Sequence, residues 1–288
     1  MLTTRAPAKI NLTLHVLGRR ENGYHSLESL VAFTGGGDRL QLSPTASLSL
    51  QISGPTATAA GTGNDNLVLR AARNLAERIE GLTLGAFYLE KRLPVAAGIG
   101  GGSSDAAAAL RLIAQVNNLS LSDPRLIEAA CATGADVPVC LEARARMMCG
   151  VGDILGPKLQ LPLLPAVLIN PGIPVDTKPV FQRLGLECGQ SLKNLPHPVL
   201  NLDDDIKVFF KKLELSRNDL EDAACQLAPI IVDILAILRA ARGVKIARMS
   251  GSGATCFAIF DAPNSAAHAA RVIRAIHPSW WIKTAALR

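Results

Sequence analysis

A glycine-rich stretch in the first half of the chain carries the strongest chemical signal in the sequence. It reads Gly98-Ile99-Gly100-Gly101-Gly102-Ser103-Ser104, and an alanine-rich segment follows it directly. Closely spaced glycines let a backbone approach an anion and turn its N–H groups toward it. A helix that starts there adds unpaired N–H donors and the positive end of its dipole. We therefore predict a polyphosphate site at this loop, with Ser103 or Ser104 capping the helix.

The loop differs from the two best-known nucleotide-binding motifs. No Gly-Lys-Ser or Gly-Lys-Thr closes it, as a Walker A motif requires. Ser103 stands where a Rossmann fingerprint has its last glycine. Taken alone, the loop fits a flexible turn between a strand and a helix equally well, so its neighbours must decide.

The elements that would position this loop can be predicted from the periodicity of apolar residues. Residues 8–16 alternate between apolar and polar side chains, which predicts a half-buried strand. In such a strand Lys9 and Asn11 lie on the same face, away from the core. A turn is predicted at residues 21–23.

The remaining pattern predicts a mixture of helices and strands. We predict helices over 66–78, 105–116, 124–132, 218–242 with a break at Pro229, and 266–276. We predict strands over 40–42, 48–52, 87–91, 166–169, 247–249, 255–260 and 281–285. A Gly- and Pro-rich segment, 150–165, marks a domain boundary. The order suits antiparallel sheets and predicts two α+β domains, residues 1–158 and 159–288.

The composition is that of a folded protein. The chain has 288 residues, 49% of them hydrophobic, which argues against global disorder. A net charge of +6 suits anionic ligands, although no block of Lys and Arg stands out. The six cysteines form no CxxC pair, which favours buried thiols in a reducing compartment.

The same sequence predicts a cytoplasmic protein with no membrane partner. Residues 1–7 lack the apolar core of a secretory signal. The longest apolar run, Ile230 to Leu238, contains Asp233 and is better explained as a core helix than as a membrane span.

Three segments resemble the motifs of the GHMP kinase superfamily. Residues 94–107, which contain the glycine-rich loop, look like its phosphate-binding motif, 7–12 like its first motif, and 250–258 like its third. Residues 218–221 resemble another recurrent element. The resemblance spans nearly the whole chain and implies a two-domain α+β architecture. Its N-terminal domain would be ribosomal-protein-S5-domain-2-like and its C-terminal domain ferredoxin-like, with ATP as co-substrate and Mg²⁺ accompanying it.

Other segments resemble one branch of that superfamily, the diphosphocytidyl-methylerythritol kinases. They are residues 23–27, 64–68 and 134–139. This resemblance implies that ATP phosphorylates the 2-hydroxyl of the methylerythritol unit of CDP-methylerythritol, in the non-mevalonate isoprenoid route.

The resemblance assigns catalytic roles to Lys9 and Asp136. A hydroxyl nucleophile needs a proton acceptor late in phosphoryl transfer, and Asp136 follows a predicted helix and precedes Pro138, which restricts the backbone. Lys9 would neutralise charge on the transferring phosphoryl, orient Asp136 and keep it ionised. Without the motif, Lys9 and Asp136 would each be interpreted as an ordinary solvent-exposed charged residue.

The remaining site residues are assigned by the same resemblance. Those expected at ATP are Asn66, Lys91, Pro94, Gly98, Gly100, Gly101, Gly102, Ser103 and Ser104. Those expected at the substrate are Asn11, Tyr24, His25, Phe181, Gly251 and Ser252, with Tyr24 and Phe181 stacking on the pyrimidine and His25 facing the cytosine edge. The protein ligand of the metal stays open: Ser104 and Asp105 are candidates, and Asp105 could instead only favour the helix N-terminus.

Structural alternatives stay open for several of these residues. Phe181 could be an ordinary core residue, Asn66 a helix cap and Lys91 a surface charge. Asn11 could be a polar residue on an exposed strand face. Gly251 could belong to a tight turn between two strands, which is compatible with a binding role.

Two rival functions remain. One is a superfamily kinase with another acceptor, such as homoserine or mevalonate, which has no pyrimidine to stack. The other is a nucleic-acid-binding module, although the sequence lacks a dense Lys/Arg face with interleaved aromatics. We expect a small-molecule substrate, no nucleic acid partner, and a monomer or weak homodimer.

Overall fold

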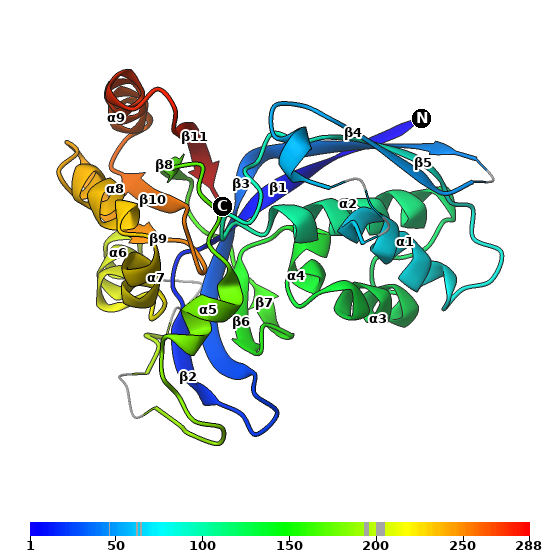
Figure 1. Ribbon diagram of the computed structural model, residues 1–288, viewed down its shortest axis with the longest axis horizontal. Coiled ribbons are helices and arrows are strands. Elements are labelled where there is room, and N and C mark those ends of the chain that lie inside the picture. The colour runs from blue at the N-terminus through cyan, green and yellow to red at the C-terminus, as the bar shows by residue number, and fades with distance from the viewer. Residues whose placement is uncertain (46, 62, 64, 193–195, 200–204) are drawn as a thin grey trace. The chain divides into compact units, whose positions relative to one another are not determined.

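The computed structural model describes residues 1–45, 47–61, 63, 65–192, 196–199 and 205–288 (Figure 1). Residue 64, part of the segment 64–68 above, lies outside the described residues. The chain forms two compact units that interleave along the sequence. The first unit consists of Met1–Lys9, Gly36–Val95 and Gly100–Ala143, and the second unit of Ile10–Gly35, Ala96–Ile99 and Arg144–Arg288.

The strands of the first unit lie in its N-terminal part, between residues 2 and 90. They are most of β1 (Leu2–Asn11), the second half of β3 (His25–Pro44), β4 (Ser49–Ser53) and β5 (Gly85–Glu90). β5 pairs antiparallel with β3 and parallel with β4, and β1 pairs with β3. The predicted strands at 40–42, 48–52 and 87–91 are confirmed, although β3 is far longer than its predicted counterpart.

Four helices of the first unit lie on one side of β4 and β5 (Figure 1). They are α1 (Leu67–Ala76), α2 (Gly101–Val116), α3 (Pro124–Thr133) and α4 (Val137–Glu142); a short 3₁₀ helix, η1 (Ala57–Ala59), precedes them. α2 buries four consecutive alanines, Ala106 to Ala109. Their small side chains let neighbouring helices approach on more than one face. The helices predicted at 66–78, 105–116 and 124–132 are confirmed, and α4 was not predicted.

α2 begins earlier than predicted, inside the glycine-rich loop. Its N-cap is Gly100, whose φ of 60° is left-handed, and no side chain caps this end. Ser103 and Ser104 therefore lie within the first turn, and the prediction that one of them caps the helix is wrong. A serine cap adopts extended backbone angles, whereas the chain enters α2 through a left-handed residue that favours glycine.

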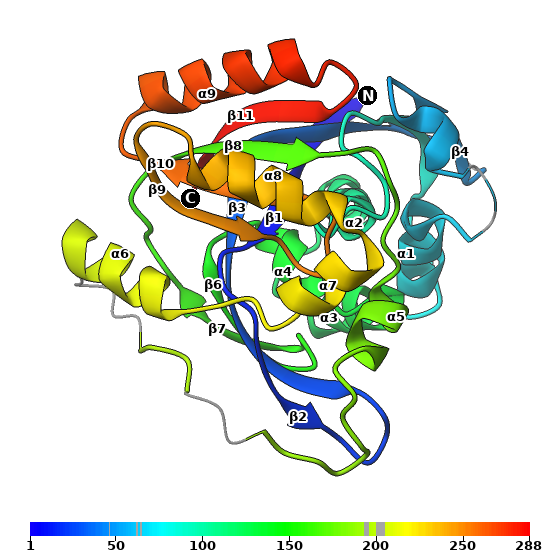
Figure 2. The same ribbon diagram turned by 60° about the vertical axis from the view of Figure 1, so that its left-hand side comes forward.

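Four strands of the second unit form an antiparallel sheet in the order β11–β8–β10–β9. These are β8 (Leu164–Asn170), β9 (Val244–Met249), β10 (Cys256–Phe260) and β11 (Trp281–Leu287). α8 (Ile230–Arg239) and α9 (Pro263–Ile276) share one hydrophobic core with this sheet (Figure 2). The order strand, helix, two strands, helix, strand is the ferredoxin-like arrangement expected for this part of the chain.

The helix predicted at 218–242 is present as two pieces, α7 (Glu221–Leu227) and α8, separated at Pro229 as expected. Elements missed by the sequence are β6 (Arg146–Gly150), β7 (Ile154–Lys158), α5 (Thr177–Gln182) and α6 (Ile206–Leu215). β6 pairs with the first half of β3 and with β7, so the segment 150–165 contains a strand. No helix in the described ranges is long and apolar enough to cross a membrane.

Cysteines differ in their surroundings, and none of the six forms a disulfide. Cys140 and Cys256 are buried, as expected. Cys131 and Cys188 are exposed, so the expectation of buried thiols is wrong for these two. Cys131 occupies the solvent side of α3, which buries Leu126, Ala129 and Ala130 instead.

The strand predicted at 8–16 is divided between two strands and is more deeply buried than expected. β1 ends at Asn11, and β2 (His15–Arg19) begins after a break. Lys9 and Asn11 are each only 4% exposed. The prediction that they lie on a face outside the core is wrong, because other polar groups cover that face and replace water as partners.

Two buried histidines lie together in the second unit. The ring centroids of His15 and His197 are 4.6 Å apart, and His197 Nε2 lies 2.7 Å from Thr13 Oγ1. His15 Nε2 accepts a hydrogen bond from the backbone N–H of Arg217. Burial, helped by the charges of Arg217 and His197 and opposed by Asp219, lowers the pKa of His15 from 6.5 to about 4. The ring is therefore neutral at pH 7.

We expect the free energy of unfolding to fall as the pH drops from about 6.5 toward about 4. In this window the unfolded chain protonates His15 and the folded chain does not, so protons favour the unfolded state. At about 1.4 kcal/mol per pKa unit, the loss due to His15 is about 2–3 kcal/mol.

Urea unfolding at about pH 7.5 and about pH 4.5 measures this effect. His15→Gln keeps a hydrogen-bond acceptor but does not titrate, so it should lose less stability between the two pH values than the wild type. An equal loss in both proteins would show that His15 is not the group responsible.

Candidate active site

Lys9 and Asp136, the two residues predicted to be catalytic, form an ion pair within the first unit. Lys9 Nζ lies 2.7 Å from Asp136 Oδ1. The lysine side chain is 5% exposed and the carboxylate 36%, so the ammonium is buried while the carboxylate reaches solvent. Asp136 is the N-cap residue of α4 but makes no side-chain cap hydrogen bond there. Its carboxylate is thus directed to Lys9 and keeps lone pairs for a further donor.

The glycine-rich loop approaches this pair closely. A Cβ atom on Gly100 would lie 3.2 Å from the Cβ of Lys9, so glycine is what allows the contact. Gly101, Gly102 and Ser103 follow at the start of α2 and are partly or fully exposed. The first N–H groups of a helix lack acceptors within it. The first unit therefore combines unpaired N–H donors, a helix dipole and a lysine ammonium in one region, which suits a polyphosphate.

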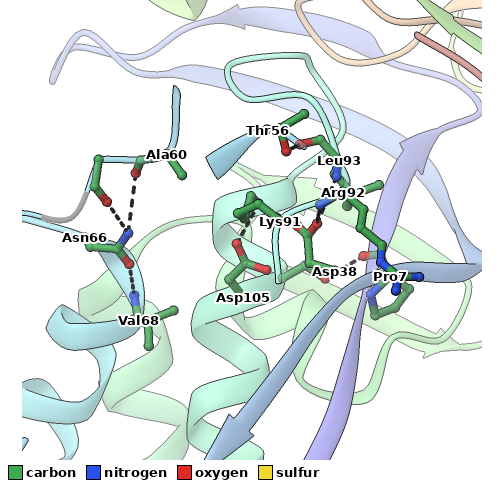
Figure 3. A network of polar contacts seen from close by, with 12 residues as sticks. Pro7, Asp38, Thr56, Ala60, Asn66, Val68, Lys91, Arg92, Leu93 and Asp105 are labelled. Atoms are coloured by element: carbon green, nitrogen blue, oxygen red, sulfur yellow. Dashed lines mark hydrogen bonds and ion pairs between the residues drawn. The ribbon is translucent and has the colours of Figure 1, made fainter. Parts of the chain in front are cut away.

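Lys91 lies at the centre of a buried ion cluster (Figure 3). Its Nζ is 2.5 Å from Asp38 Oδ2 and 2.7 Å from Asp105 Oδ2. All three residues are at most 3% exposed. The alternative that Lys91 is a surface charge is wrong. A Cβ on Gly101 would lie 3.6 Å from Lys91 Nζ, so the cluster packs against the glycine-rich loop.

Burial and neighbouring charges shift the pKa values of Lys91 and Asp105 in this cluster. Burial lowers the pKa of Lys91, but the carboxylates of Asp105 and Asp38 raise it more, so its pKa ends above the ordinary value. Burial and the charge of Asp38 raise the pKa of Asp105 against the opposing effect of Lys91. Asp38 is held by the backbone N–H groups of Arg92 and Leu93 through its other oxygen. Asp105 therefore takes up a proton more readily than an ordinary aspartate does.

Asn66 acts as the cap of α1, as its structural alternative supposed (Figure 3). Its Oδ1 accepts a hydrogen bond from Val68 N at 3.0 Å, and its Nδ2 donates to Gly61 O at 2.9 Å. The residue thus joins the start of α1 to the preceding segment. Contacts of Asn66, and of the partly exposed Pro94, with ATP stay predictions.

The two residues considered as metal ligands are used inside the first unit. Ser104 is fully buried, and its hydroxyl donates to Pro7 O at 2.5 Å. Asp105 is 3% exposed, with Oδ2 on Lys91 and with no partner for Oδ1 in the described part of the chain. The described residues also contain no group of three or more His, Cys, Asp or Glu able to hold a metal ion. These residues do not fit a protein site for Mg²⁺.

In the second unit, Ser250 connects Asn11 to the first half of the glycine-rich loop. Its hydroxyl accepts from Asn11 N at 3.1 Å and donates to Gly98 O at 3.0 Å. A Cβ on Gly98, which has φ of +71°, would lie 2.4 Å from Ser250 O. The Asn11 side chain donates to Ser29 Oγ at 2.7 Å. Ser250 was not predicted as a site residue, although it begins the third motif.

The element at 218–221 holds the third motif in place. Asn218 Nδ2 donates to Met249 O at 2.8 Å and to Gly251 O at 2.9 Å. Glu221 accepts from Met249 N at 2.9 Å. Gly251 lies in a tight turn between β9 and β10, so the turn alternative is confirmed. The predicted role of Gly251 and Ser252 at the substrate stays a prediction.

His25 and Phe181 stack on each other within the second unit. Their ring centroids are 4.7 Å apart and their planes differ by 30°. His25 Nε2 is buried with no hydrogen-bond partner among the described residues. Burial and the charge of Arg19 lower the pKa of His25, which keeps the ring neutral at pH 7. Tyr24 is 65% exposed, so two of the three predicted rings are in contact and the third faces solvent.

Comparison with known proteins bears on the fold as a whole. The model for the GHMP kinases N terminal domain matches residues 66–144, and the model for GHMP kinases C terminal matches residues 201–282. A crystal structure of 4-(cytidine 5'-diphospho)-2C-methyl-D-erythritol kinase superposes with a TM-score of 0.78 at 32% identity, covering 99% of each chain. Homoserine kinase from Cytophaga hutchinsonii gives 0.69 at 19% identity, covering 99% of this chain and 94% of its own, which shows the fold alone. The predicted fold class is confirmed.

Two sequence relatives match over their full lengths. The 4-diphosphocytidyl-2-C-methyl-D-erythritol kinase of Methylorubrum extorquens (strain PA1) is 60% identical over 284 residues, 98% of each chain. The protein of the same name from Rhodopseudomonas palustris (strain HaA2) is 53% identical over 293 residues, covering 99% of this chain and 98% of its own. With these matches, the chain belongs to the GHMP kinases, in the family of the 4-diphosphocytidyl-2-C-methyl-D-erythritol kinases.

Proposed function

We propose that this protein transfers the γ-phosphoryl group of ATP to the 2-hydroxyl of 4-diphosphocytidyl-2-C-methyl-D-erythritol, giving the 2-phosphate and ADP. The observation that carries the proposal is the Lys9–Asp136 ion pair, 2.7 Å long, beside the glycine-rich loop. Phosphoryl transfer needs charge stabilisation and a positioned acceptor hydroxyl, and the pair offers one group for each. The reaction belongs to the non-mevalonate route to isoprenoid precursors.

Asp136 positions the acceptor hydroxyl and takes its proton as the oxygen bonds to the γ-phosphorus. The bond from that phosphorus to the bridging oxygen breaks, and ADP leaves. Lys9 stabilises the negative charge on the transferring group and orients the carboxylate. A carboxylate is a weak base, so positioning of the hydroxyl matters as much as proton removal.

ATP is bound by the phosphate loop and its surroundings. Backbone N–H groups at Gly100, Gly101, Gly102 and Ser103 hold the phosphates, and Gly98 and Ser104 keep the loop in shape. Asn66, Lys91 and Pro94 are assigned to the nucleotide by the family resemblance. Mg²⁺ would accompany ATP and neutralise charge on its phosphates, and Ser104 and Asp105 do not fit as its ligands.

The cytidine part of the substrate is bound by residues of the second unit. The unpartnered Nε2 of the neutral His25 serves the cytosine edge, and Phe181 fixes the orientation of that ring. Tyr24 supplies an exposed face for stacking. Asn11, Gly251 and Ser252 bind the hydroxyls or the diphosphate.

The remaining predictions from the sequence complete the proposal. We keep the division into domains 1–158 and 159–288, since each family-model match falls within one of the two. The compact units cross this division, because Ile10–Gly35 and Ala96–Ile99 belong to the second unit. The protein is proposed to act in the cytoplasm, as a monomer or weak homodimer, without nucleic acid.

A kinase assay with three acceptors tests the reaction. We expect ADP to form with CDP-methylerythritol and not with homoserine or mevalonate, measured by coupled ADP detection with purified protein, ATP and Mg²⁺. Turnover with homoserine or mevalonate would keep the kinase chemistry and overturn the roles of Tyr24, His25 and Phe181. Folded protein inactive with all three, but binding RNA in a steeply salt-dependent way, would favour the nucleic-acid module.

Asp136→Asn should lower kcat by about 10²–10⁴-fold, because the acceptor hydroxyl loses its base and its partner. ATP affinity, measured by calorimetry, should stay within about threefold, since the loop is untouched. Asp123→Asn is the matched control, because Asp123 is a carboxylate at the N-cap of another helix of the first unit. Unchanged kcat in Asp136→Asn would remove the residue from the base role.

Tyr24→Ala should raise KM for the cytidine substrate about 5- to 100-fold, since stacking on a base contributes about 1–3 kcal/mol. KM for ATP should not change. Tyr24→Phe keeps the ring and should behave like the wild type. The stacking role is wrong if steady-state kinetics give the alanine variant a normal KM.

A further inference from the structure

Arg111 has no place in the proposed reaction, yet it contacts both elements that carry the catalytic ion pair. This half-buried residue lies on α2, and its Nη1 donates to Cys140 O at 2.8 Å and to Leu141 O at 3.2 Å. Its Nη2 donates to Arg5 O at 2.6 Å. The first two carbonyls end α4, the helix that begins after Asp136, and the third belongs to β1, the strand that carries the lysine of the pair.

Ser104 makes a second connection of the same kind. It lies seven residues before Arg111, two helical turns away, and therefore on the same face of α2. Its hydroxyl donates to Pro7 O of β1 at 2.5 Å. One face of α2 thus holds β1 at two points along its length, through Ser104 and Arg111, and holds α4 through Arg111.

Arg111 acts from a distance. It lies ten residues beyond Gly101, or about 15 Å along the axis at 1.5 Å per residue. A phosphate bound at the start of α2 is therefore out of its reach. Whatever Arg111 does for the reaction must pass through β1 and α4.

The position of Asp136 depends on where α4 lies. The carboxylate makes no cap hydrogen bond to its own helix, and α4 is only six residues long. The last carbonyls of a helix need donors from elsewhere, and Arg111 supplies two of them. A shift of α4 would move Asp136 directly.

We propose that Arg111, together with Ser104, is a positioning residue that keeps Lys9 and Asp136 in place relative to the phosphate loop. The kinetic part of the proposal rests on the function proposed above. The planar guanidinium suits the task because it presents donors in two directions to three carbonyls, whereas a lysine ammonium is a single point charge.

The kinetic test compares Arg111→Met with Arg111→Lys and with Arg78→Met. Arg78 is the matched control, since it is a half-buried arginine of the first unit whose Nη1 donates to a carbonyl, Asn74 O, at 2.7 Å. Arg111→Met should lower kcat per folded molecule about 10- to 100-fold and leave KM for ATP within about threefold, as misplacement of catalytic groups predicts. Arg111→Lys should recover part of the loss, and Arg78→Met should match the wild type.

A double-mutant cycle shows whether the effect passes through the ion pair. In a Lys9→Met background, Arg111→Met should lower the residual kcat by less than about threefold. An equal loss with and without Lys9 would overturn the proposal. If Arg111→Met does not fold, the same double-mutant cycle is measured with Ser104→Ala and with Arg111→Lys in place of Arg111→Met.

A second readout does not depend on turnover. Lys9 is 4% exposed, so brief acetylation followed by mass spectrometry should find it protected in the wild type and in Arg78→Met. Protection should fall in Arg111→Met. If Arg111→Met loses protection of Lys9 although the wild type phosphorylates no acceptor, the positioning role stands and only the assigned reaction is abandoned. If Arg111→Met has unchanged protection and unchanged kcat, the positioning role is wrong.

Discussion

A buried ammonium group needs a negative partner, and in the first unit this need ties distant parts of the chain together. The carboxylate that pairs with Lys9 is that of Asp136, which lies 127 residues further along the sequence. Removing one partner of a buried pair costs about 3–5 kcal/mol, and less where a carboxylate reaches solvent as here. β1, α2 and α4 must therefore keep their places for the pair to exist. α2 meets this requirement with alanines that permit close contact and with polar groups that hold its neighbours.

The second unit solves a comparable problem with neutral groups. Ser250, Asn218 and Ser29 satisfy backbone and amide groups around Asn11 and the third motif. Each of these groups has a hydrogen-bond partner, which is the condition for placing polar side chains away from water. Among the described residues, His15 Nδ1 and His25 Nε2 depart from this condition, and each of these rings lies against another aromatic ring.

Local features of the sequence predict helices and strands well, but they predict poorly which side chains are buried by residues distant in the sequence. Apolar periodicity gives the helices at 66–78 and 124–132 and the strands of the ferredoxin-like sheet, because each pattern is complete within its own segment. The burial of Lys9 and Asn11 follows from residues far away in the sequence, so alternation alone misjudges it. Family resemblance assigns His25 and Phe181 to one substrate, but it does not predict that the two rings stack on each other. Arg111 gives no signal at all, since an arginine in a helix is read as part of a solvated face.

The glycines of the phosphate loop and of the third motif require one another. A Cβ on Gly98 would strike Ser250 O at 2.4 Å, and a Cβ on Gly251 would strike Gly98 O at 2.7 Å. Neither position can acquire a side chain while the other backbone stays where it is. Two segments 152 residues apart are thus constrained together, because each glycine faces backbone atoms of the other segment and no change of side chain there would make room. Gly98 of the phosphate-binding motif is therefore required by the backbone of Ser250 and Gly253 that it faces, and not only by a bound phosphate.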